Sequence, residues 1–108
     1  MARPRRELDK ILKDILEKHE IPKTNLYFQP GNDIYLNYPC VIYSLGSIDR
    51  VGANNSLYLA NNKYDVTVIS EDPDTTIPMD ILKTIPNSYY SRRYIADNLY
   101  HDSLTLYF

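Results

Sequence analysis

The chain has 108 residues, enough for one hydrophobic core, so we expect a single domain over residues 1–108. Twelve lysines and arginines against 14 aspartates and glutamates give a formal net charge of −2. That balance excludes a strongly basic field, so we expect no specific nucleic-acid binding and no general attraction to anionic membranes. Cys40 is the only cysteine, which excludes an internal disulfide and fits a reducing compartment.

No apolar run approaches the roughly 20 residues that span a bilayer, and the amino-terminal MARPRREL lacks the apolar stretch of a secretory signal. We therefore expect a protein that is made in the cytoplasm and stays there until it joins an assembly. The 11 tyrosines, beside no tryptophan and two phenylalanines, favour broad protein contacts, because tyrosine joins a large contact area to a polar tip. The alternative is that many tyrosines lie half-buried on strands.

Residues 5–19 have the pattern of an amphipathic helix. Five apolar residues recur at helical spacing and predict one buried stripe: Leu8, Ile11, Leu12, Ile15 and Leu16. Pro4 suits the helix start, and Pro22 closes the region after its end. A protonated His19 at that end would interact favourably with the helix dipole, which is a sufficient structural reason for it.

Two strands are predicted next. Leu26–Phe28 predicts a short strand, followed by a turn at residues 30–33. Residues 39–50 predict a longer strand whose two faces are both largely apolar, as in the interior of a sheet. Gly46 within it predicts a bulge or a close backbone approach.

The stretch 51–62 is rich in glycine and asparagine and has no helical period. It predicts a connection well beyond the length of an ordinary hairpin loop. Long loops of this kind are commonly functional or disordered, so this one is a candidate contact arm that presents Tyr58 and Leu59.

The segment from Lys63 to Pro86 predicts a strand, a turn that we call the acidic corner (residues 71–74, EDPD), and a short helix. Tyr64, Val66 and Val68 alternate with Asp65, Thr67 and Ile69. Pro73 stops the strand inside the acidic corner, and the helix begins near Thr75 or Thr76. The predicted apolar stripe of the helix consists of Ile77, Ile81, Leu82 and Ile85.

The remaining chain predicts two strands joined by a turn at Asp97-Asn98. Simple alternation over residues 88–98 places Tyr90, Arg92 and Tyr94 on one face, which would meet water or a partner. The same alternation places Tyr89, Ser91, Arg93 and Ile95 on the other face. In the last strand, Leu104, Leu106 and Phe108 alternate with Thr105 and Tyr107.

The element order is helix, short strand, strand, long connection, strand, helix, strand, strand. It predicts an α+β domain with a single-layer, mostly antiparallel sheet of about four to five strands. The N-terminal helix and the short second helix are expected to pack on one side of that sheet.

Asp72 and Asp74, with Glu71 beside them, form the most concentrated carboxylate cluster in the chain. They could supply hard oxygen ligands to Mg²⁺ or Ca²⁺. The turn-and-cap interpretation is favoured, because no glycine or later bidentate glutamate completes a calcium loop.

No other pattern indicates chemistry. His19, His101 and Cys40 do not have the spacing of a zinc site, and no phosphate-binding glycine loop or nucleophile motif occurs. We therefore expect no catalytic residue, no metal and no cofactor, and a protein that is not an enzyme.

Three strings together carry a family resemblance: YPCVIYSL, KYDVTVISEDPD and ADNLYHDSLTLYF. With the arginine-containing N-terminal helix and the I-P helix between them, their order and spacing resemble the tail-completion (tail-terminator) proteins of long-tailed bacteriophages. Proteins of this family are also described as minor capsid or head–tail joining proteins. The resemblance covers nearly the whole chain, but none of its motifs is catalytic.

This resemblance implies a structural virion protein with an α/β layer, assembled as a ring that is commonly hexameric. Such a ring caps the tail tube, stops its growth and docks to the neck of the filled head, so the implied partners are other copies of the chain, the tail tube protein and a head-closure or neck protein. DNA would pass through the ring lumen. The implied location is the head–tail junction of the virion, with assembly in the host cytoplasm.

Ring assembly requires heterologous interfaces, and aromatic residues and arginine are common anchors of interfaces. The candidate interface residues are Tyr58, Leu59, Asp72, Asp74, Tyr90, Arg92, Arg93 and Tyr94. Two alternatives remain open. One is a head-closure or other neck connector protein, and the other is a small metal-binding or enzymatic domain that uses the acidic corner.

Overall fold

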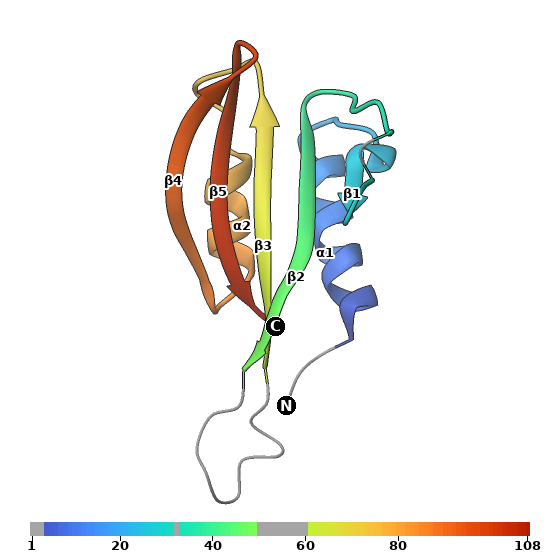
Figure 1. Ribbon diagram of the computed structural model, residues 1–108, viewed down its shortest axis with the longest axis vertical. Coiled ribbons are helices and arrows are strands. Elements are labelled where there is room, and N and C mark those ends of the chain that lie inside the picture. The colour runs from blue at the N-terminus through green and yellow to red at the C-terminus, as the bar shows by residue number, and fades with distance from the viewer. Residues whose placement is uncertain (1–3, 32, 50–60) are drawn as a thin grey trace, which may run out of the picture.

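The computed structural model describes residues 4–31, 33–49 and 61–108, and these form two α-helices and a five-stranded sheet (Figure 1). In chain order the elements are α1 (Arg5–Lys18), the 3-10 turn η1 (Lys23–Asn25), β1 (Leu26–Phe28), β2 (Cys40–Asp49), β3 (Asn61–Ser70), α2 (Ile77–Thr84), β4 (Ser88–Ala96) and β5 (Leu99–Tyr107). The strand order is β1-β2-β3-β5-β4. Both helices lie on the same face of the sheet (Figure 1). The predicted α+β class is confirmed.

Helix α1 buries the predicted stripe against the sheet. Leu8, Leu12 and Leu16 are at most 1% exposed, and Ile11 packs at the margin of the core. The helix ends because Glu20 takes a left-handed backbone conformation with φ 62°. The Ile21 amide then donates to the Leu16 carbonyl at 2.9 Å, which satisfies a free carbonyl of the last turn.

Strands β2 and β3 form the centre of the core. They pair antiparallel with Val41 opposite Val68 and Tyr43 opposite Val66, so the predicted alternation of both strands is confirmed. Register shifts between Leu45 and Ser47, which confirms a bulge at Gly46. A Cβ atom at Gly46 would lie 2.7 Å from an Asp65 carboxylate oxygen, so the Asp65 side chain lies close against the Gly46 backbone.

The helix face of the sheet carries the main core, and the other face carries a small second core. Leu104 and Leu106 of β5 join the main core with Ile77, Ile81 and Ile85 from the α2 segment. The second core consists of Cys40, Ile69 and Leu99, with Tyr27, Leu36 and Ile42 packed against it. Burial raises the pKa of the Cys40 thiol to about 12, so this cysteine is an uncharged packing residue.

Strands β4 and β5 form a hairpin around a two-residue turn. Asp97 and Asn98 have φ values of 53° and 62°, and Ala96 is opposite Leu99. Two consecutive left-handed residues are the signature of the turn that matches the twist of a hairpin. The predicted Asp97-Asn98 turn is confirmed.

Strand β1 pairs with β2 in parallel and the other strand pairs are antiparallel, so the predicted mostly antiparallel sheet is confirmed. One sequence expectation needs correction. Asn61 and Asn62 were expected in the long connection but belong to β3. Tyr58 and Leu59, the candidate contact residues within that connection, lie outside the described residues. Within the residues that the structure describes, no helix is long and apolar enough to cross a membrane.

Candidate interaction surface

The acidic corner is a self-contained turn between β3 and α2. The Ser70 hydroxyl accepts a hydrogen bond from the Asp72 amide at 3.0 Å, and the Asp72 carboxylate accepts one from the Asp74 amide at 2.9 Å. The Thr75 hydroxyl accepts from the Ile77 amide at 3.4 Å, where α2 begins. The turn favoured from the sequence is present, but the predicted carboxylate cap is not, because the N-cap residue of α2 is Thr76 and it makes no side-chain cap hydrogen bond.

The corner does not supply a set of metal ligands. In residues 4–31, 33–49 and 61–108, no group of three or more histidine, cysteine, aspartate or glutamate side chains is placed to hold a metal ion. A cavity of about 370 Å³ lies beside the corner, lined by Asp72 and Asp74 together with His19 and Tyr38. The acidic corner therefore forms one side of this cavity.

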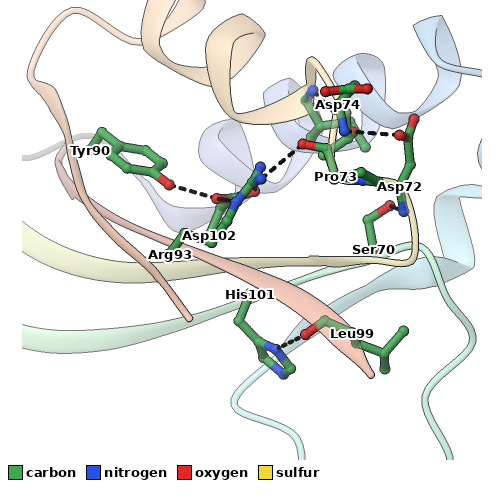
Figure 2. Close-up of polar contacts among 11 residues, drawn as sticks. Ser70, Asp72, Pro73, Asp74, Tyr90, Arg93, Leu99, His101 and Asp102 are labelled. Carbon is green, nitrogen blue, oxygen red and sulfur yellow. Dashed lines mark hydrogen bonds and ion pairs between the residues drawn. The ribbon is translucent and has the colours of Figure 1, made fainter. Parts of the chain in front are cut away.

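A buried carboxylate on β5 organises β4. The Asp102 side chain is 1% exposed and accepts hydrogen bonds from Arg93 Nε at 2.8 Å and Tyr90 Oη at 2.6 Å (Figure 2). Arg93 Nη1 also donates to the Pro73 carbonyl at 2.8 Å. Arg93 thus connects β4 and β5 to the acidic corner.

The protonation states in this network follow from its contacts. Burial alone would raise the pKa of Asp102, but the hydrogen bonds from Arg93 and Tyr90 outweigh burial and hold that pKa below its ordinary value. The hydrogen bond to Asp102 raises the pKa of Arg93 and also that of Tyr90. Asp102 and Arg93 therefore form an ion pair at neutral pH.

The predicted faces of β4 are wrong, because register shifts between Tyr90 and Arg92. The extra residue in this bulge puts Tyr90 and Arg93 on the helix face of the sheet, where both contact Asp102. Arg92 and Tyr94 lie on the opposite face, which we call the open face. Figure 2 shows the same division on β5, with Asp102 on the side of the helices and His101 on the other side.

The open face carries a ladder of stacked side chains next to β4. The Arg92 guanidinium lies 5.3 Å from the Tyr94 ring centroid, and the Tyr94 ring stacks on His101 at 4.7 Å with an interplanar angle of 17°. Tyr89 and Tyr107 form a second aromatic pair, edge to face at 6.2 Å. These contacts hold large aromatic side chains upright on the sheet.

Exposed apolar residues gather at the two opposite edges of the sheet. The β4 edge presents Tyr89, Tyr90, Tyr94 and Ile95. The β1 edge, formed by β1, the β1–β2 connection and the adjoining part of β2, presents Phe28, Ile34, Tyr35, Tyr38 and Leu45. Among the described residues, Met79 on α2 is the one other large apolar side chain of comparable exposure. Two separate apolar surfaces on one small domain indicate contact sites for partners.

The β1 edge is a surface that was not predicted from the sequence. A second network supports it, in which Arg5 lies 4.3 Å from the Phe28 ring centroid and donates to the Tyr43 hydroxyl at 2.9 Å. Tyr43 in turn donates to Asp9 at 2.6 Å. The available signal was the number of apolar residues in NLYFQPGNDIYLNYP, a stretch interrupted by turn residues.

The candidate interface residues that the structure describes lie in two places. Asp72 and Asp74 lie at the acidic corner, and the other four lie on β4: Tyr90, Arg92, Arg93 and Tyr94. No protein-family model matches this chain, and no curated protein matches it. The functional assignment therefore depends on the two edges of the sheet and on the resemblance of the sequence motifs.

Proposed function

We propose that this chain is a structural subunit that assembles with other copies of itself into a ring, and that the ring terminates a bacteriophage tail tube at the head–tail junction. The observation that carries the proposal is the pair of apolar edges at opposite sides of one sheet (Figure 1). A closed ring joins each copy to the next through two different surfaces, and a domain with one surface at each edge meets that requirement.

The phage role is supported by the motifs YPCVIYSL, KYDVTVISEDPD and ADNLYHDSLTLYF, which resemble the tail-terminator family. The resemblance supports a hexameric ring with the tail tube protein on one side and a head-closure or neck protein on the other. It also supports a location in the virion and a structural rather than an enzymatic role.

Self-assembly is tested first. The purified chain is measured by sedimentation velocity over a concentration series and imaged by negative-stain electron microscopy. We expect a discrete oligomer and ring-shaped particles with an open centre. A monomer at every concentration, with and without the tail tube protein, would overturn the ring proposal.

The phage role is tested in an infection with a phage whose copy of this gene is deleted. We expect overlong or headless tails in the lysate, because tail growth would not be stopped or joined to heads. The alternative, a head-closure protein, predicts normal-length tails together with heads that lose their DNA. Normal virions in normal numbers would contradict both roles.

A further inference from the structure

Strand β4 has an unpaired edge along its whole length. It runs from Ser88 to Ala96, pairs only with β5 among the described strands, and is the last strand on its side of the sheet. Its seven residues from Tyr89 to Ile95 are all exposed. An edge strand with this much open backbone is a template for pairing with another strand.

The outward-pointing backbone groups of β4 can be identified. The Asn87 carbonyl accepts from the Tyr107 amide at 2.9 Å, so Asn87 and Tyr107 form a hydrogen-bonded pair of the β4–β5 ladder. Bonded and non-bonded pairs alternate along an antiparallel ladder. Counting along β5, which has no bulge, the non-bonded positions are Leu104, Asp102 and Tyr100. The β4 residues opposite them are Tyr90, Arg93 and Ile95, and their backbone N–H and C=O groups point away from β5.

The β1 edge fits this template in direction and charge. The strand pairings make β1 and β2 antiparallel to β4, so the β1 edge of a second copy would meet β4 in antiparallel orientation in a continued sheet. The charged residues of β4 are Arg92 and Arg93, whereas Asp33 is the one charged residue between Leu26 and Pro39. Among the described residues, neither Arg92 nor Asp33 has an ion-pair partner in its own chain.

We propose that the β4 edge of one copy binds the β1 edge of a second copy, so that the sheet continues from subunit to subunit. Ile95 and the tyrosines of β4 would pack against the exposed side chains around Tyr35, and Arg92 would lie near Asp33 of the second copy. The inference rests on the proposed self-assembly and specifies which surfaces carry it.

A mixture of two edge variants tests whether the contact joins two different surfaces, the β4 edge of one copy and the β1 edge of the next. Ile95→Lys places a charge on the β4 edge at a side chain that is 66% exposed, and Tyr35→Lys does so on the β1 edge at one that is 95% exposed. Met79→Lys on α2, at 54% exposure, is the matched control. Circular dichroism and thermal unfolding verify that each variant is folded.

We expect each edge variant to raise the dissociation constant of self-association by about tenfold or more, and Met79→Lys to leave it unchanged. An equimolar mixture of Ile95→Lys and Tyr35→Lys should form a 1:1 dimer. Each variant keeps the edge that the other has lost, so one intact contact remains. If Tyr35→Lys by itself forms dimers, and mixing it with Ile95→Lys does not increase the amount of dimer, then β4 pairs with β4. That result would overturn the inference.

A charge exchange gives an independent readout. Arg92→Asp and Asp33→Arg should each weaken association, and the double variant should recover most of the loss, because the attractive pair is restored with reversed sign. Assembly that withstands both lysine substitutions would overturn the inference while leaving ring formation intact. A wild-type chain that stays monomeric would instead overturn the proposed function itself.

Discussion

Asp102 shows how a buried charge is kept in this small domain. An isolated carboxylate in the core would be strongly disfavoured, because its hydration is lost. Here Arg93 and Tyr90 replace the lost water contacts, and Arg93 remains partly exposed, with 35% of its side chain accessible. The two donors come from one strand, so the carboxylate also fixes how the bulged β4 lies against β5.

Replacing Asp102 with asparagine should lower the free energy of unfolding by about 2 kcal/mol at pH 7, because the ion pair with Arg93 is lost. The pKa of Asp102 is below its ordinary value in the folded state, so the contribution of its charge is fully present above pH 4. It is lost as the pH falls through the folded-state pKa. The difference in stability between wild type and Asp102→Asn should therefore shrink in acid.

Urea unfolding of both proteins at pH 7 and at pH 3 measures this difference. Asp9, whose pKa is also lowered, is present in both proteins, so its own pH dependence cancels from the comparison. A difference in stability that stays constant between these two pH values would contradict the assignment of an ion pair to Asp102.

Tyr43 is a second buried residue whose polar group, the phenolic hydroxyl, is held by hydrogen bonds to charged side chains. Its side chain is fully buried, and burial together with the hydrogen bond to Asp9 raises its pKa to about 12. Tyr43→Phe should cost about 1–2 kcal/mol, because Asp9 and Arg5 both lose a hydrogen-bond partner. Tyr27→Phe is the control. Its hydroxyl accepts from the exposed Asn37 amide, so we expect a loss below about 0.5 kcal/mol by chemical denaturation.

At the scale of elements, the sequence was sufficient wherever a buried face repeats locally. The stripe of α1 and the alternation of β2 and β3 follow from periodicity alone, since Leu8, Leu12, Val66 and Val68 are buried as expected. The Pro73 corner and the Asp97-Asn98 turn were also predictable, because turn residues act through their own backbone preferences.

The sequence was insufficient wherever the partner strand decides the outcome. Alternation in β4 breaks at the bulge, so Tyr90 and Arg92 lie on opposite faces, and nothing in SYYSRRYIA marks the extra residue. The role of Asp102 depends on that register, since only the bulge brings Arg93 to its face. The parallel pairing of β1 and the gathering of side chains at its edge likewise depend on contacts between distant residues.

The hairpin turn gives an element-scale prediction. Asn98 has φ 62°, a conformation that asparagine and glycine adopt more readily than alanine. Asn98→Ala should therefore destabilise the domain by about 1 kcal/mol, and Asn98→Gly should be neutral or slightly stabilising. Thermal unfolding of the two variants measures the difference. Equal losses for alanine and glycine would show that the asparagine side chain, rather than its backbone, matters at this turn.

At the scale of the whole molecule, the two edges that carry the exposed apolar residues differ from each other, so the domain has a direction along its sheet. One edge contributes a long strand, and the other contributes a short strand with an apolar connection. Because these edges differ, repeated association has a defined sense from one copy to the next. The helix face and the open face of the sheet would then keep the same sides throughout such an assembly.

Assembly should make the apparent stability of the chain depend on its concentration. Association of folded subunits stabilises each subunit by about 0.7 kcal/mol in a dimer, and by about 1.1 kcal/mol in a hexamer, for each tenfold rise in concentration above the dissociation constant. That corresponds to an increase of several degrees in Tm for a domain of this size. Differential scanning calorimetry over a concentration series measures the shift. For Ile95→Lys the rise in Tm should begin at a concentration about tenfold or more higher than for the wild type. A Tm that is constant for the wild type would contradict self-association.

The strand order has a consequence for how the chain folds. Strands β1, β2 and β3 follow one another both in the chain and in the sheet, and β4 and β5 form a hairpin. Among the elements that the structure describes, pairing of β3 with β5 is the one strand contact that encloses others, namely α2 and β4. Folding thus divides into two sequence-local units whose junction is β3–β5, and the entropy of closing that loop is the main cost of joining them. Backbone amides along this junction, flanked by strands on both sides, should exchange with solvent most slowly of all.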